Sequence, residues 1–175
     1  HNWQAMSIDI EAGLAYIPTQ ENAFFYAIQE DYKKTGVYKR NPGRWNMGIE
    51  MSSLAQNILN NLESQPKPGG FLKAFDPLTG ETKWSVPIPH YWNGGVLGTE
   101  GGLVFQGDAL GMFSAYDKQT GGRLWEVNTY TSMLAPPITY EIDGEQYVSI
   151  LTGSGGGDMF GGEPLPPIEV QASLK

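Results

Sequence analysis

The sequence AFDPLTGETKW at residues 74–84 occurs a second time, with changes, as AYDKQTGGRLW at residues 115–125. The two copies share Ala, Asp, Thr, Gly and Trp at matching positions, and they start 41 residues apart. A fixed spacing of this size is typical of stacked supersecondary units, and it is close to the length of a four-stranded propeller blade. The chain is therefore predicted to contain an internal structural repeat.

Each copy predicts two strands joined by a tight turn. Asp76 and Asp117 begin Asp-x-x-Thr-Gly turns, in which the carboxylate bonds backbone amides and Gly adopts positive φ. Trp84 and Trp125 end the return strands, and the shared Ala leaves room for a large ring. We expect each Trp to dock on the next repeat, which gives both aspartates and both tryptophans structural rather than catalytic roles.

A weaker third copy is expected at the N-terminus. Ser7, Asp9, Gly13 and Ile17 occupy the positions of Ala, Asp, Gly and Trp. This copy starts 67 residues before the copy at residues 74–84. The spacing predicts one repeat plus an insertion of about half its length.

Composition favours many short strands. The chain of 175 residues contains 23 Gly and 12 Pro, with 12% aromatic residues, which is typical of an all-β protein. A net charge of −8 argues against nucleic acid or an anionic membrane as partner. The absence of Cys excludes disulfides, thiolate metal sites and covalent haem attachment within these residues. The chain has no initiator Met, signal peptide or membrane-length apolar run, so we expect it to be a piece of something larger.

Residues 29–70 interrupt the strand pattern. Strands are expected before this insertion at residues 3–10, 14–17 and 23–28, and a short helix is expected within it at residues 51–63. The insertion also carries a basic group, Lys33, Lys34, Lys39 and Arg40. This group is interpreted as a solvated loop face, with a docking site for an electron acceptor as the alternative. The insertion could also border a substrate entrance.

Strands and turns alternate again after residue 70. A hairpin is predicted over residues 71–86, and four strands that start at residue 94 make one blade. Asp143 and Gly144 predict a type I′ turn between strands at residues 136–142 and 145–151. The glycine-rich residues 152–157 lack the Lys and the following helix of a phosphate-binding loop. Blades are thus expected over residues 1–160, followed by a Pro/Gly-rich tail or linker at residues 161–175.

Three further motifs accompany the repeats: HNWQAMS at residues 1–7, YWNGGVL at residues 91–97 and the hairpin with its glycine-rich loop at residues 136–157. Together they resemble the pyrroloquinoline-quinone (PQQ) dependent, or quinoprotein, alcohol dehydrogenases, whose eight-bladed β-propellers are held by tryptophan-docking repeats. The resemblance covers residues 1 to about 157. It implies an all-β propeller, of which this chain supplies about three blades in the C-terminal part.

The resemblance also implies a site. In this family PQQ lies on the propeller axis with Ca²⁺ or a lanthanide, an Asp acts as base on the alcohol, and electrons pass to a cytochrome c or another respiratory acceptor in the periplasm. The cofactor-binding residues implied for this chain are Asn2, Trp3, Trp92, Gly153 and Ser154. Relatives commonly have Trp where this chain has Ser154, which implies a bulkier alcohol. The catalytic Asp, metal carboxylate and paired cysteines lie upstream in the family, so no catalytic residue or metal ligand is expected here.

Several alternatives stay open at this point. Asn2 can be a strand residue bonded to a loop, and Trp3 and Trp92 can be core residues. His90 has no ligand cluster around it, so packing or solvent exposure is expected rather than metal binding. The whole chain can belong to a non-catalytic propeller that binds proteins, as in outer-membrane assembly lipoproteins that share the docking repeat. A sugar dehydrogenase on the same propeller is a third reading.

Overall fold

The computed structural model describes residues 1–23, 26–40, 42–43, 46–50, 60, 63, 67 and 69–153. The chain divides into two compact units, one of His1–Glu21 with Pro68–Lys175 and one of Asn22–Lys67. The helix expected at residues 51–63 lies almost entirely outside the described residues, as do Ser154 and the tail. Within the described part, no helix combines the length and apolarity needed to span a membrane.

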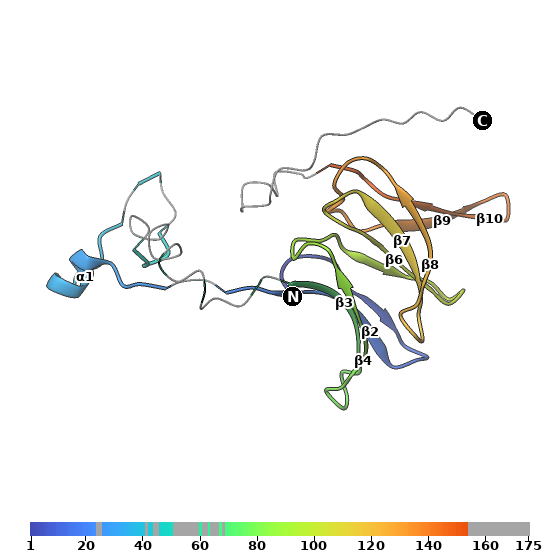
Figure 1. Cartoon of the computed structure of the whole chain (residues 1–175), viewed down its shortest axis with the longest axis horizontal. Coiled ribbons are helices and arrows are strands. Elements are labelled where there is room, and N and C mark those ends of the chain that lie inside the picture. Colours follow the sequence, from blue (N-terminus) through green and yellow to red (C-terminus); the bar gives the residue numbers. More distant parts are fainter. Residues whose placement is uncertain are drawn as a thin grey trace. The chain divides into compact units, whose positions relative to one another are not determined.

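The first unit consists of antiparallel sheets (Figure 1). One four-stranded sheet has the order β1-β2-β3-β4, a second has the order β5-β6-β7-β8, and β9 pairs with β10. The strands are β1 (Ser7–Asp9), β2 (Leu14–Glu21), β3 (Gly69–Phe75), β4 (Thr82–Ile88), β5 (Val96–Gly98), β6 (Leu103–Gly107), β7 (Met112–Asp117), β8 (Arg123–Asn128), β9 (Ile138–Ile142) and β10 (Glu145–Ser149). The predicted hairpin after residue 70 and the four-stranded blade after residue 94 are confirmed.

The repeated phrase folds as predicted at both copies, where it joins β3 to β4 and β7 to β8. Asp76 and Asp117 each accept hydrogen bonds from the backbone N–H groups two and three residues further on, at 2.8 to 3.2 Å. Gly80 and Gly121 follow with φ of +77° and +72°, a region that favours glycine. The backbone hydrogen bonds lower the pKa of both carboxyl groups. Both aspartates are therefore engaged in holding their turns.

The hairpin of β9 and β10 also has the predicted turn. Asp143 and Gly144 connect the strands with φ of +51° and +82°. A type I′ turn requires positive φ at both central residues. The Asp-Gly pair thus identifies this hairpin correctly.

The interpretation of residues 7–17 as a separate repeat is wrong. Their turn does form, because Asp9 accepts a hydrogen bond from the Ala12 N–H at 3.0 Å and Gly13 has φ of +66°. However, it joins β1 to β2, the first two strands of the sheet whose last two strands carry residues 74–84. The insertion expected from residue 29 onward therefore lies between β2 and β3 of a single sheet, rather than between two separate repeats.

The unit Asn22–Lys67 contains a short helix that the sequence analysis did not predict. Helix α1 (Glu30–Thr35) ends at Gly36, whose φ is +67° and whose N–H bonds the Tyr32 carbonyl. The strand expected at residues 23–28 is not seen among the described residues of that stretch, where Ile28 makes an isolated bridge to Ile49.

The two four-stranded sheets share a core, and two side chains of the first sheet bond one backbone carbonyl of the second. Trp84 on β4 donates its indole N–H to the Lys118 carbonyl at 3.1 Å, and the Tyr16 hydroxyl donates to the same oxygen at 3.2 Å. A Cβ at Gly121 would lie 2.7 Å from the Trp84 ring, so only glycine leaves space for the indole. Burial raises the pKa of Tyr16 to about 12, which keeps its hydroxyl a donor. The Trp of the first copy thus contacts the turn of the second.

The Trp of the second copy, Trp125, makes a different contact from that of Trp84. Trp125 on β8 is 49% exposed, and its ring meets Phe113 on β7 edge-on with centroids 5.9 Å apart. All six residues of β8 are exposed.

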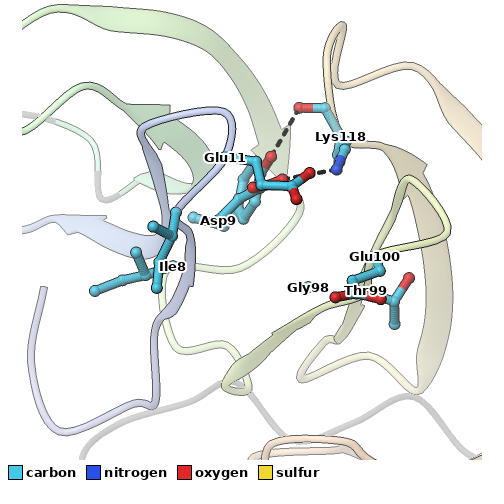
Figure 2. A pocket seen from close by; sticks show the side chains of 9 residues that line it. Ile8, Asp9, Glu11, Gly98, Thr99, Glu100 and Lys118 are labelled. Atoms are coloured by element: carbon cyan, nitrogen blue, oxygen red, sulfur yellow. Dashed lines mark hydrogen bonds and ion pairs between the residues drawn. The ribbon is translucent and has the colours of Figure 1, made fainter.

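An ion pair joins the same two sheets. The Lys118 ammonium lies 2.7 Å from the Asp9 carboxylate, and both side chains are largely covered (Figure 2). The hydrogen bond from Lys118 is the largest cause that lowers the pKa of Asp9, and Asp9 in turn raises the pKa of Lys118. Lys118 therefore contacts the first sheet through both its carbonyl and its side chain.

The two equivalent turn glycines allow a matched test of the Trp84 contact. Gly121→Ala adds the cost of positive φ and a clash with the indole, whereas a Cβ at Gly80 would meet nothing within 4 Å. We expect Gly80→Ala to lower the free energy of unfolding by about 1 kcal/mol and Gly121→Ala by roughly 2–4 kcal/mol. Urea unfolding of the full-length protein measures both. Equal losses would show that the Trp84 contact is unimportant.

The Asp9–Lys118 pair predicts a pH dependence. Because the folded pKa of Asp9 is lowered, its contribution is present above the ordinary carboxyl pKa of about 3.9 and is lost as pH falls through the folded value. Lys118→Met should therefore lower the urea midpoint at neutral pH and flatten its acid dependence. Lys33→Met, which removes an exposed pair with Glu30, is the control. A Lys118→Met profile parallel to wild type would contradict this assignment.

Candidate cofactor site

Three connecting segments, each leading toward a strand or hairpin, meet in the first unit. They comprise residues 2–5 before β1, residues 92–95 before β5 and residues 132–136 before β9. The Val96 N–H bonds the Ala5 carbonyl at 2.9 Å. A Cβ at Gly95 would lie 2.8 Å from Pro136 Cβ and 3.1 Å from the Ala5 nitrogen. Glycine at position 95 thus lets the three segments approach one another closely.

Two of the predicted site residues are in contact there. The rings of Trp3 and Trp92 meet at an angle of 65° with centroids 6.0 Å apart, although the residues are 89 positions apart in the chain. Trp3 is 55% exposed, so much of its ring remains open to a ligand. The neighbouring Asn2 is exposed as well. The pair forms an aromatic corner, a term used below for Trp3 and Trp92 together.

Gly153 is connected to the same region. Its N–H donates to the Ser132 carbonyl at 2.6 Å, and it forms a parallel bridge with Met133. The Met133 carbonyl in turn lies against Gly94, where a Cβ would approach it to 2.8 Å. The structure therefore links Gly153 to the segment that carries Trp92. Ser154 lies outside the described residues.

Sequence reasoning missed a set of buried polar side chains at this place. Gln4, Asn93 and Ser132 lie one on each connecting segment and are only 2–3% exposed, and each has a side-chain oxygen with no hydrogen-bond partner in the described part of the chain. Gln106 on β6 donates to the Gly94 carbonyl at 3.0 Å, but its own oxygen is likewise unpartnered. Buried polar atoms are normally paired, so these oxygens point to a bound ligand or water. Gln4, Asn93 and Gln106 each stand alone between small or apolar residues, which was the available signal, whereas Ser132 follows Thr131.

A buried carboxylate lies in the turn between β6 and β7. Burial raises the pKa of Asp108, while the N–H groups of Leu110 and Met112, each at 2.9 Å, oppose that effect. Asp108 also interacts electrostatically with His90. The sequence analysis did not select this residue.

A cavity of about 230 Å³ lies beside the Asp9–Lys118 pair, between the two four-stranded sheets (Figure 2). Its lining includes the apolar Ile8 and Ile10 and the carboxylates Glu11 and Glu100. The predicted site residues that the structure describes, Asn2, Trp3, Trp92 and Gly153, do not line it. Among the described residues, no three His, Asp or Glu side chains are grouped so that they could hold a metal ion.

The comparisons with known proteins agree with this architecture. The PQQ family model, described as "Glucose/ethanol/alcohol dehydrogenase, beta-propeller domain", matches residues 86–148. The chain is 38% identical to quinohemoprotein alcohol dehydrogenase ADH-IIG of Pseudomonas putida and 40% identical to quinohemoprotein alcohol dehydrogenase of Comamonas testosteroni, in each case over 89% of this chain and 21% of the relative. It thus spans about a fifth of the length of these relatives.

A solved structure of ADHIIG from Pseudomonas putida HK5 is similar in fold, with a TM-score of 0.72 and 37% identity over 87% of this chain and 22% of that one. Both the sheets and the sequence are therefore shared with these enzymes. The chain belongs to the PQQ-dependent alcohol dehydrogenase family, and it forms part of the family's β-propeller.

Proposed function

We propose that the protein containing this chain oxidises an alcohol with PQQ and passes the electrons to a cytochrome c or another respiratory acceptor in the periplasm. The observation that carries this proposal is the aromatic corner, where residues 89 positions apart meet beside exposed Asn2. The cofactor's Ca²⁺ or lanthanide ion is assigned mainly to residues outside this chain.

The residues present fit one edge of a planar quinone. The open ring of Trp3 offers an apolar surface, and Trp92 stands at 65° to it, so a flat ligand can contact one ring face and one ring edge. The Asn2 amide offers two N–H donors to carbonyl oxygens. The unpartnered oxygens of Gln4 and Asn93 can bind water or donor groups behind this edge. Gly153 and Ser154 are assigned to the loop that completes the cofactor site.

When bound, PQQ supplies an acceptor for the electron pair that leaves the alcohol carbon. The contribution of this chain is orientation and water exclusion. The aromatic corner would pack against the cofactor ring, and the Asn2 amide would donate hydrogen bonds to its carbonyl oxygens. Holding reactants in a productive geometry lowers the entropic part of the barrier.

Asp76 and Asp117 do not suit the role of general base. Both accept turn hydrogen bonds from backbone N–H groups, and these bonds lower the pKa of each carboxyl. A base with a depressed pKa is weak at neutral pH. We therefore assign the proton-abstracting carboxylate to another part of the protein.

The proposal predicts a selective effect of Trp92. Removal of its indole should weaken PQQ binding by about two- to tenfold, because an aromatic contact contributes roughly 0.5–1.5 kcal/mol. The test is a PQQ titration of full-length Trp92→Ala, followed by quinone absorbance, with dye-linked alcohol oxidation measured beside it. Trp125→Ala, which removes a half-exposed Trp on β8, should leave the affinity unchanged.

A protein that shows no quinone absorbance and gains no alcohol oxidation with PQQ and Ca²⁺ would overturn the proposal. That result would favour a non-catalytic propeller that binds proteins. Equal losses in Trp92→Ala and Trp125→Ala would instead show that the aromatic corner has no special relation to the cofactor.

A further inference from the structure

His90 stands at the start of the loop that carries Trp92. This loop runs between the end of β4 and the start of β5. The imidazole Nδ1 accepts a hydrogen bond from the Trp92 backbone N–H at 3.0 Å. The His90 carbonyl accepts a second hydrogen bond, from the side-chain amide of Asn93. The ring also stacks on Tyr91, with centroids 4.7 Å apart and an interplanar angle of 22°. His90 is thus bonded to both residues that follow Tyr91.

The loop lies against Gly70 on β3, the strand that pairs with β4. A Cβ at Gly70 on β3 would overlap the His90 carbonyl and the Asn93 amide. Asn93 itself is only 3% exposed, so its amide is fixed between the loop and β3. Within this loop, the bond from the Trp92 N–H to His90 Nδ1 restrains the Trp92 peptide group.

We propose that His90 is a positioning residue, whose unprotonated Nδ1 fixes the Trp92 backbone and thereby sets the indole against Trp3. A side chain with no acceptor at this position would remove the bond from the Trp92 N–H, and the aromatic corner would then be held less firmly. The expected effect on PQQ affinity rests on the proposed function. The expected effect on the geometry of Trp3 and Trp92 does not.

Two titratable groups are close enough to His90 to matter. Asp108, in the turn between β6 and β7, interacts with it electrostatically, and Tyr91 lies against its ring. The stacking on Tyr91 restrains the ring in the orientation that the hydrogen bond from the Trp92 N–H requires.

Gly70 provides an independent test of the loop. Gly70→Ala should displace the His90 carbonyl and the Asn93 amide and disturb the corner at every pH. The matched control is Gly69→Ala, because a Cβ there would meet the flexible Phe71 ring at 3.0 Å and the Glu21 Cβ at 3.9 Å. Circular dichroism of the coupled Trp3 and Trp92 rings reports the corner directly, and Trp3→Phe identifies that signal. A Gly70→Ala spectrum like that of wild type would contradict the proposed support.

The decisive experiment compares His90→Asn and His90→Leu with wild type in the full-length protein at pH 8. Asn places an acceptor oxygen near the position of Nδ1, so this variant should keep the wild-type signal and PQQ affinity. His90→Leu should weaken the Trp3–Trp92 signal and lose about fivefold in affinity, as expected for one hydrogen bond. The other histidine of the chain is controlled with His1→Asn.

The outcomes separate this inference from the proposed function. Absence of PQQ binding in wild type overturns the proposed function, while the Trp3–Trp92 signal of the two His90 variants still decides the role of His90. Equal losses of that signal in His90→Asn and His90→Leu overturn the positioning role. So does an unchanged signal and affinity in His90→Leu.

Discussion

The Lys118 carbonyl and the Trp84 indole together determine how the two four-stranded sheets meet. The oxygen accepts hydrogen bonds from Trp84 and Tyr16, both of the first sheet, while Lys118 belongs to the turn of the second. Positive φ at Gly121 bends that turn, and the missing side chain gives the indole its place. One turn thus supplies both the acceptor and the space, and a part-buried acceptor shared by two donors is costly to leave unmet.

The relation between the sheets also determines the candidate site. Ala5, just before β1 of the first sheet, and Val96, the first residue of β5 in the second, are joined by a backbone hydrogen bond. Trp3 precedes the first of these residues and Trp92 precedes the second. The contact of the two rings therefore depends on the packing of the sheets, to which Trp84 on β4 and Lys118 in the β7–β8 turn contribute. This is how a rigid scaffold positions residues of its connecting loops.

The sequence predicted those features that depend on local hydrogen bonds. Asp76, Asp117 and the Asp143–Gly144 pair all form the expected turns, because their bonding partners lie within a few residues. The same reasoning failed at residues 7–17, since Asp9 and Gly13 specify a turn but not the position of its hairpin in the sheet. The missing Trp at position 17 was the distinguishing feature. Trp84 on β4 packs against the turn of the second sheet, whereas Ile17 lies on β2 and pairs with Lys73 of β3.

The candidate site could likewise be predicted from the sequence only in part. Trp3 and Trp92 could be selected from the sequence because they stand in recognisable motifs, but Gln4, Ser132 and His90 could not. The importance of Gln4 and Ser132 comes from burial without a partner, which only the packing of three distant segments creates. His90 looked isolated because its partners are a backbone N–H and a neighbouring amide rather than charged side chains. A histidine without a ligand cluster can thus still matter, when its ring nitrogen holds the backbone of the residue that forms the site.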